Sequence, residues 1–181
     1  MRNLTELIRG LPNWPKLLTS QELDIAQAME SGHVDALRKA PVLFVTGEKP
    51  PVFSAEELTL LKGYLREGGF IFACPTCKSP DFEIGFRAVV EQLTDKQELR
   101  RLPADHLVYR SEYVLDANTA PLLGVDVGGR TSIVYSTEDL GCLWDYWARQ
   151  DPPNRNENLK SKIRRATQIG VNVISYATHR Q

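Results

Sequence analysis

Residues 41–77, PVLFVTGEKPPVFSAEELTLLKGYLREGGFIFACPTC, decide the fold of this chain. PVLFVT is a short apolar run, rich in β-branched and aromatic residues, that lies between a proline and a glycine, a pattern that predicts a buried strand. FIFAC predicts a second buried strand. The residues between them predict a helix, and two buried strands joined by a helix form the repeating unit of a parallel α/β sheet.

The helix between the two strands carries its own start and stop signals. Ser54 followed by Glu57 predicts a capping box, in which each side chain bonds the other residue's backbone N–H. Gly68-Gly69 predicts the end of the helix, because glycine adopts the left-handed conformation with little strain. The residues expected on its inner face are Leu58, Leu61 and Leu65.

Composition limits the class of protein. The 181 residues suit one domain, 1–181, with 42% hydrophobic and 25% charged residues. A net charge of -1 gives no attraction to nucleic acid. The chain has no apolar run of about 18 residues that could span a bilayer, and its start lacks the core of a signal peptide, so we expect it to be cytoplasmic. Three cysteines, an odd number, argue against a disulfide framework and favour a reducing compartment.

Further elements are predicted from periodicity and capping signals. We expect Lys16–Leu18 to form a brief strand, Leu107–Leu115 to be partly extended, and Arg130–Ser136 to form a third buried strand. The expected helices are Asn3–Ile8, Ser20–Met29 with Ser20 as its cap, Phe82–Leu93 and Leu159–Ala177.

Three loops follow the predicted buried strands: Thr46–Phe53, Cys74–Asp81 and Ser136–Trp144. Sites in open α/β sheets collect beyond the carboxyl ends of the strands, so we expect these loops to form a binding crevice. The residues expected in it are Glu48, Lys49, Cys77, Asp81, Glu138, Asp139 and Trp144.

Cys74 stands where a catalytic nucleophile would lie, at the end of a strand before a loop and helix, with His106 or His179 as its base. The residue that follows it is Pro75, which has no N–H to hold an oxyanion. The bulky Phe72 and Thr76 also flank a turn that requires small residues. The alternative is a buried thiol that packs as a small hydrophobe.

A metal site is a further candidate. Cys74 and Cys77 have the spacing of a zinc knuckle, and Cys142 with His106 would complete four ligands for zinc. A second close pair of ligands is missing, so the two thiols near a turn remain the alternative, as does a dithiol redox motif.

Two other groups have both a functional and a structural interpretation. Trp144, Tyr146 and Trp147 could offer a stacking surface to a sugar or peptide, or could pack in the core. His106 could be a base oriented by Asp105, or an exposed loop histidine.

The order of several segments carries a resemblance to a known family. The segments are VLFVTGEKPPVFSAEELTLLKGYLREGGFIFAC, FEIGFRAVVEQL, LRRLPADHLVYRSEY, GGRTSIVYSTEDLGCLWDYW and IGVNVISYATH. The chain resembles, from about Asn3 to His179, the bacterial family known as domain of unknown function 4159. The resemblance implies a class I glutamine amidotransferase-like α/β fold, a flavodoxin-like three-layer sandwich with a mostly parallel sheet. Relatives often look exported or membrane-associated, and the chain could be trimmed from a longer protein.

The resemblance brings no established reaction. Where amidotransferases have G-x-C-x-G, this chain has Phe72-Ala73-Cys74-Pro75-Thr76, which keeps only the cysteine. We therefore expect a non-catalytic binding or assembly module for a protein or carbohydrate partner, without a cofactor. One alternative is a cysteine-dependent hydrolase or amidotransferase-like enzyme with Cys74 as nucleophile. The other is a metal-binding domain that uses Cys74, Cys77 and Cys142.

Overall fold

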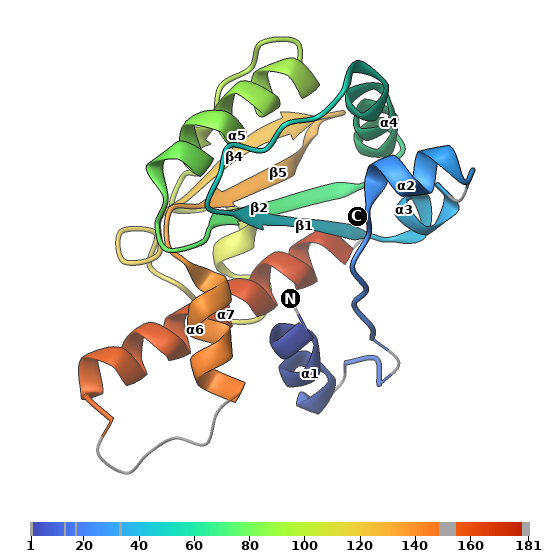
Figure 1. Cartoon of the computed structure of the whole chain (residues 1–181). Coiled ribbons are helices and arrows are strands. Elements are labelled where there is room, and N and C mark those ends of the chain that lie inside the picture. The colour runs from blue at the N-terminus through green and yellow to red at the C-terminus, as the bar shows by residue number, and fades with distance from the viewer. Residues whose placement is uncertain (1, 13, 17, 33, 149–154, 179–181) are drawn as a thin grey trace.

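The computed structural model describes residues 2–178 except 13, 17, 33 and 149–154. Its sheet has five strands in the order β1-β2-β5-β4-β3, and helices lie on both faces of it (Figure 1). The strands are β1 (Val42–Gly47), β2 (Phe70–Pro75), β3 (Arg100–Arg101), β4 (Leu122–Val127) and β5 (Arg130–Ser136).

Seven α-helices and one 3₁₀ helix are assigned in the described residues. In Figure 1, α4 and α5 lie over one face of the sheet, and α1, α6 and α7 lie over the other. The helices are α1 (Arg2–Gly10), α2 (Ile25–Glu30), α3 (Asp35–Lys39), α4 (Ala55–Arg66), α5 (Pro80–Leu93), η1 (Leu107–Tyr109), α6 (Leu140–Ala148) and α7 (Glu157–Thr178).

The predicted strand–helix–strand unit is confirmed. β1 and β2 pair in parallel from Val42↔Phe70 to Gly47↔Pro75, and α4 connects them. Both bonds of the capping box form between Ser54 and Glu57, at 2.7 and 3.2 Å. Gly68 follows the helix with a φ of +93°, the left-handed conformation expected of it.

The sheet is mixed, so the expectation of a mostly parallel sheet holds for only two of its four strand pairs. β1–β2 and β2–β5 are parallel, whereas β5–β4 and β4–β3 are antiparallel. Gly128 and Gly129 have φ values of +66° and +85° and join β4 to β5 as a tight hairpin. Such a two-residue turn forces antiparallel pairing, because the chain reverses with no room for a crossover helix.

Three local predictions are corrected. α2 begins at Ile25 because the Asp24 carboxylate accepts a bond from the Gln27 N–H at 2.9 Å, so Ser20 does not cap it. Lys16 and Leu18 lie in no strand, since the Lys16 ammonium turns back to the carbonyls of residues 9 and 11. The segment expected to be extended starts with η1, which His106 caps through its ring nitrogen.

Asn172 joins α7 to the segment that follows η1. Its side chain is fully buried, and its Oδ1 accepts bonds from the backbone N–H groups of Glu112 and Tyr113. Its Nδ2 donates to the carbonyls of Val108 and Tyr113. A single amide therefore satisfies four backbone groups, which lie in a buried or partly buried site.

We expect Asn172→Ala to lower the free energy of unfolding by about 3 kcal/mol, because backbone donors and acceptors lose their partners in a buried site. Urea denaturation followed by circular dichroism measures the change. Ser161→Ala, at an exposed position of the same helix, is the matched control and should change stability by less than about 0.5 kcal/mol. Equal stability of the two variants would contradict the role assigned to Asn172.

Candidate functional site

The loops that follow the three parallel strands meet at one end of the sheet, where the strands have their carboxyl ends. Gly47 of β1 lies level with Pro75 of β2, and Ala73 pairs with Tyr135 of β5. The Thr76 N–H donates to the Gly47 carbonyl at 2.8 Å and extends the pairing one residue beyond the strand. The predicted convergence of these loops is therefore present.

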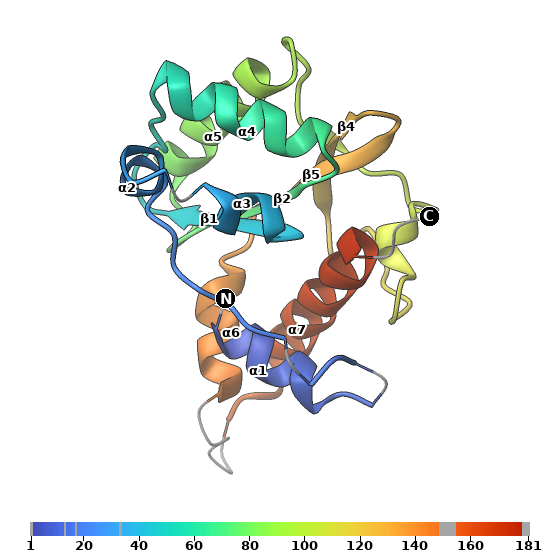
Figure 2. The ribbon, with the colours of Figure 1, turned by 90° about the vertical axis from the view of Figure 1, so that its right-hand side faces the viewer.

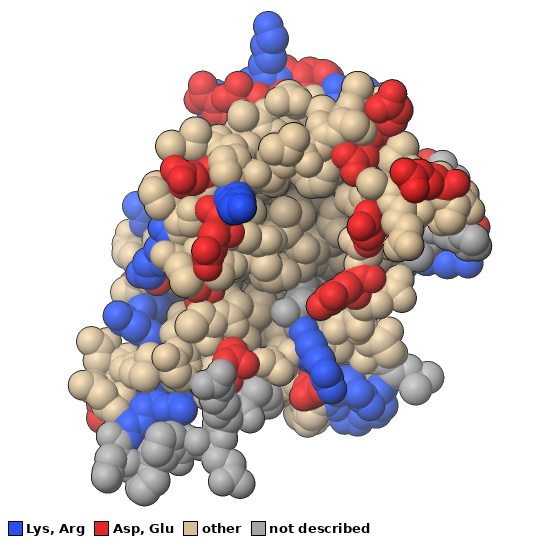
Figure 3. Space-filling view, in the orientation of Figure 1, with Lys and Arg blue, Asp and Glu red and all other residues tan. Residues whose placement is uncertain are grey.

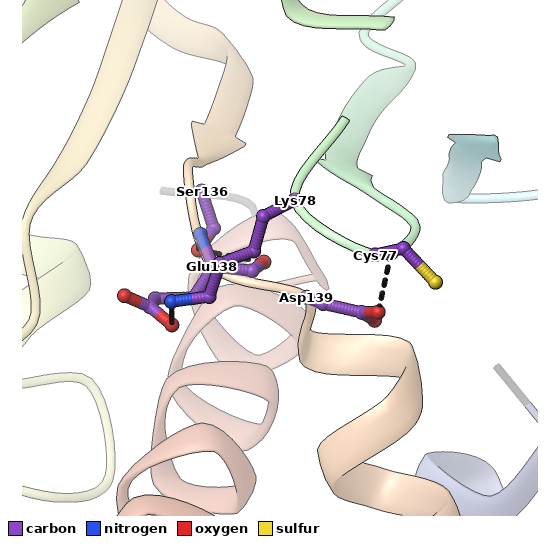
Figure 4. Close-up of polar contacts among 5 residues, drawn as sticks. All are labelled: Cys77, Lys78, Ser136, Glu138 and Asp139. Atoms are coloured by element: carbon purple, nitrogen blue, oxygen red, sulfur yellow. Dashed lines mark hydrogen bonds and ion pairs between the residues drawn. The ribbon is translucent and has the colours of Figure 1, made fainter. Parts of the chain in front are cut away.

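Asp139 joins the loop after β2 to the start of α6. Its Oδ2 accepts a bond from the Cys77 N–H at 2.7 Å, and its Oδ1 accepts one from the Cys142 N–H at 2.8 Å. Figure 4 shows the Asp139 carboxylate pointing at the Cys77 backbone, with the Cys77 thiol directed away. Because both oxygens hold backbone donors, this carboxylate positions loops and caps a helix.

Lys78 and Glu138 form a second link between the same two loops, with Nζ and Oε2 2.8 Å apart (Figure 4). Both side chains are about half exposed, so this ion pair contributes little to stability. The Glu138 N–H also donates to the Ser136 hydroxyl, with the nitrogen and Oγ 3.2 Å apart. The carboxylates of Glu138 and Asp139, in the loop after β5, are thus engaged by neighbouring groups of the protein.

The loop after β1 is held against α5. The Ser79 hydroxyl donates to the Glu48 carbonyl. A Cβ at Gly85 would lie 2.5 Å from Pro50 Cβ, so only glycine lets this loop pack so closely on the helix. The Thr46 and Thr76 hydroxyls bond each other at 3.1 Å across the ends of β1 and β2.

Two exposed aliphatic side chains flank the contact between Pro50 and Gly85. Val52 is 86% exposed and Ile84 is 68% exposed. Pro50 itself is exposed. We call Pro50, Val52 and Ile84 the apolar knuckle. It adjoins polar residues of the same loops, because Glu48 and Lys49 precede it and Asp81 lies in the first turn of α5, all three exposed.

Cys74 lies near the end of β2 and belongs to the core that α1, α6 and α7 cover. Its side chain is 0% exposed, and its Sγ lies 3.9 Å from Thr46 Oγ1. Burial raises the pKa of the thiol, although the backbone N–H groups of Leu140 and Gly141 at the start of α6 oppose this. A buried, protonated thiol packs as a small hydrophobe, which is the structural alternative raised from the sequence.

His106 lies at the other end of the sheet. Its Nε2 is 2.9 Å from the hydroxyl of Thr131, which itself donates to the Asp126 carboxylate at 2.6 Å. Nδ1 accepts the Val108 N–H at 3.1 Å, so the ring is neutral with its proton on Nε2. Thr131 is the second residue of β5 and Ser136 is the last, a span of roughly 16 Å, so the structure does not bring His106 to Cys74. His179 lies outside the described residues.

The proposed zinc ligands are likewise not assembled. Cys74 is buried, Cys77 and Cys142 lie on the surface, and His106 is at the opposite end of β5. Among the residues that the structure describes, no group of three or more His, Cys, Asp or Glu side chains is placed to hold a metal.

Trp144 is a core residue, contrary to its predicted place in the crevice. It is 1% exposed, and its ring lies 5.5 Å from Phe44 and 6.2 Å from Phe72. Its Nε1 donates to the Ala166 carbonyl at 3.0 Å. Tyr146 is exposed, and the side chain of Trp147 lies outside the described part.

Of the residues predicted for the crevice, Glu48, Cys77, Glu138 and Asp139 lie in the loops that meet at the carboxyl ends of the strands, and Lys49 and Asp81 are exposed in the same loops. Their role in binding stays a prediction. Sequence reasoning missed the hydroxyls of Thr46, Thr76 and Ser79, which join the loops. These hydroxyls could have been predicted to join the loops, because the three residues lie at strand ends or at a helix start. The electrostatics of this edge are acidic, and Glu48, burial and Asp139, in that order, raise the pKa of the exposed Cys77 thiol.

We expect Glu48→Gln to speed alkylation of Cys77, because removal of the nearest carboxylate lowers the pKa of the thiol and raises the thiolate fraction. Iodoacetamide labelling at pH 8, followed by mass spectrometry, measures the rate at each cysteine. Glu56→Gln, on the exposed first turn of α4, is the control and should leave the rate unchanged. Cys74 should label only after unfolding; rapid labelling in the folded protein would contradict its burial.

His106 makes stability depend on pH. Burial lowers its pKa, although Asp126 and Asp105 oppose the shift. Below the unfolded-state pKa of about 6.5 the unfolded chain therefore binds the proton more readily than the folded chain. The stability contributed by the neutral ring is present above about pH 6.5 and is lost as pH falls through the folded-state pKa.

We expect His106→Asn to flatten the dependence of unfolding free energy on pH between about 7 and 5. Asparagine keeps an acceptor near the position of Nδ1 for the Val108 N–H but does not titrate. Urea denaturation at a series of pH values measures the slope for both proteins. An unchanged slope in the variant would show that other groups control the acid sensitivity.

Comparison with known proteins places the chain in a family. No curated protein matches its sequence. No helix in the described residues is long and apolar enough to cross a membrane. A family profile matches residues 3–178, nearly the whole chain. The chain belongs to the family described as Domain of unknown function (DUF4159).

Proposed function

We propose that this domain is a non-catalytic protein-binding module. Its contact surface is formed by the loops at the carboxyl ends of β1, β2 and β5. The apolar knuckle lies at the centre of this surface, and Glu48 and Lys49 lie beside it. The observation that carries the proposal is the exposure of Val52 and Ile84 on a loop and helix held together at Pro50 and Gly85. Exposed apolar side chains with a polar rim are typical of protein contact sites.

The rigidity of the surface supports binding. The three loops are already connected in the free protein, through the side chains of Asp139 and Ser79 and the Thr46–Thr76 hydrogen bond. A surface that is already ordered loses little conformational entropy on association, so more of the contact energy appears as affinity.

The surroundings of Cys74 favour binding over covalent catalysis. The thiol is inaccessible, its pKa is raised, and the nearest described candidate base lies at the far end of β5. A protein partner also fits better than a carbohydrate, because the tryptophan expected to stack on a sugar is inside the core.

For the fold, we propose a relationship to the flavodoxin-like architecture of class I glutamine amidotransferases. The parallel β1-α4-β2 unit and the helices on both faces support it. The β4–β5 hairpin is then a local addition at one side of the parallel strands.

Photocrosslinking tests the proposed surface. With benzoylphenylalanine at position 52, we expect one discrete protein adduct in a lysate of the cells that carry the gene. Excess wild-type domain should suppress the adduct, whereas the Ile84→Glu variant should not, because a charge in the apolar knuckle opposes its desolvation. The matched control places the crosslinker at position 114, where Val114 is 93% exposed and lies after η1. Equal adducts from both positions, or none that the wild-type domain suppresses, would rule out the knuckle as a contact site.

A further inference from the structure

The two edges of the sheet differ in how they discourage pairing with another chain. β3, at one edge, has two residues, and both are arginines. Short, charged edge strands resist the addition of a further strand. β1, at the other edge, has six residues, VLFVTG, with no charge and no proline. The sheet therefore lacks, at β1, the protection it has at β3.

The outward peptide groups of β1 can be assigned from its pairing with β2. The Gly47 carbonyl accepts the Thr76 N–H and so faces β2. Peptide groups alternate sides along a strand, so those of Val45 also face β2, whereas those of Phe44 and Thr46 face outward. Within the described part of the chain, no other residue is hydrogen-bonded to these outward groups.

The segment from residue 18 to residue 24 covers only the start of this edge. Leu18 packs with the core on one face of the sheet, and Leu23 packs with the core on the other. Figures 1 and 2 show the connection between α1 and α2 crossing beside the beginning of β1. It forms no strand there. In the carboxyl half of β1, Thr46 is exposed and its neighbours are partly exposed. Figure 3 shows a hollow with an uncharged surface in the middle of this face.

Acidic residues flank the same edge. Glu22 and Asp24 lie on the segment that crosses it, Glu48 follows β1, and Glu56 lies in the first turn of α4. Between residues 18 and 32 the chain has no lysine or arginine. Figure 3 shows acidic side chains on both sides of the hollow and basic side chains near it as well, and Lys49 is exposed next to Glu48. The carboxylates that flank the edge attract positive charge.

We propose that the outer edge of β1 docks an extended, basic segment of a partner protein, which adds to the sheet as a sixth strand. The backbone of the segment bonds the outward peptide groups of Phe44 and Thr46, and its lysine or arginine side chains meet Glu22 and Glu48. The acidic surroundings disfavour pairing of two copies through their β1 strands, because like charges would face each other. This site adjoins the surface around the apolar knuckle and shares Glu48 with it, but the inference does not rest on the proposed function.

Hydrogen exchange with a short peptide tests the site directly. The probe is acetyl-Lys-Val-Lys-Val-Lys-amide, followed by NMR on the isotope-labelled domain. In the free protein the amides of Phe44 and Thr46 should exchange quickly and that of Val45 slowly, since only the last faces β2. Saturating peptide should slow exchange at Phe44 and Thr46 at least about tenfold.

Two control peptides separate backbone pairing from charge attraction. The same peptide with all five residues N-methylated has no strand-forming donors on either edge, and its methyl groups obstruct close pairing, so it should not protect either amide. Its counterpart with glutamate in place of lysine should bind at least about tenfold more weakly at low salt.

Variants of the edge complete the test. Thr46→Pro removes an outward N–H, which an edge strand tolerates, and should weaken peptide binding at least about tenfold. Thr46→Val loses the hydroxyl but keeps that N–H, and should weaken binding less than Thr46→Pro does. Should the proline variant fail to fold, Glu22→Lys serves in its place, because it reverses an exposed charge and should weaken binding of the basic peptide.

Three outcomes would overturn the proposal. The first is absence of binding by the basic peptide. The second is binding that leaves exchange at Phe44 and Thr46 unchanged, which would be charge attraction alone. The third is protection of these amides that rises with domain concentration in the absence of peptide, which would identify a second copy as the occupant.

Discussion

The burial of β2 on both faces constrains the rest of the structure. All six of its residues are buried, and their side chains alternate between the two cores. A strand without polar positions has no face to offer to water, so helices must cover it on both sides. α4 and α5 provide one cover, and α1, α6 and α7 provide the other. The same burial holds Cys74 below the surface at the end of the strand.

At the end of the sheet where the parallel strands finish, several charged side chains already have hydrogen-bond or ion-pair partners within the protein. Asp139 uses both carboxylate oxygens on backbone donors, and Lys78 pairs with Glu138. Residues that suggest acid–base chemistry in a linear sequence are here engaged in fixing loops. Aliphatic side chains remain exposed beside them, and this contrast is the physical basis for regarding the edge as a contact surface.

Much of the fold could be predicted because its signals are local. The capping box at Ser54 and the glycine at position 68 act within a few residues, and the strand PVLFVT is bounded by its own neighbours. The β4–β5 pairing also has a local signal, because two glycines between apolar runs are typical of a tight hairpin. The start of α2 depended on which of several polar residues caps it, a competition that sequence alone leaves open.

The candidate site was predictable only to the level of its loops. Parallel strand ends must converge, so the grouping of Glu48, Cys77 and Asp139 follows from the topology. The burial of Trp144 does not, because it depends on α7 supplying the Ala166 carbonyl from distant sequence. The separation of His106 from Cys74 depends on contacts with Thr131 and Val108 that join β5 to η1.

The contact between α1 and α7 has a consequence for how the protein is made. A Cβ at Gly170 would lie 2.7 Å from Leu4, so the first helix packs directly on the last one, and Figure 2 shows them side by side. Leu4 and Ile8 share one core with Val171 and Ile174 of α7. During translation, α1 leaves the ribosome long before its partner exists. One face of the sheet thus lacks part of its cover until synthesis reaches α7, and in that interval its exposed apolar surface makes the nascent chain prone to aggregation.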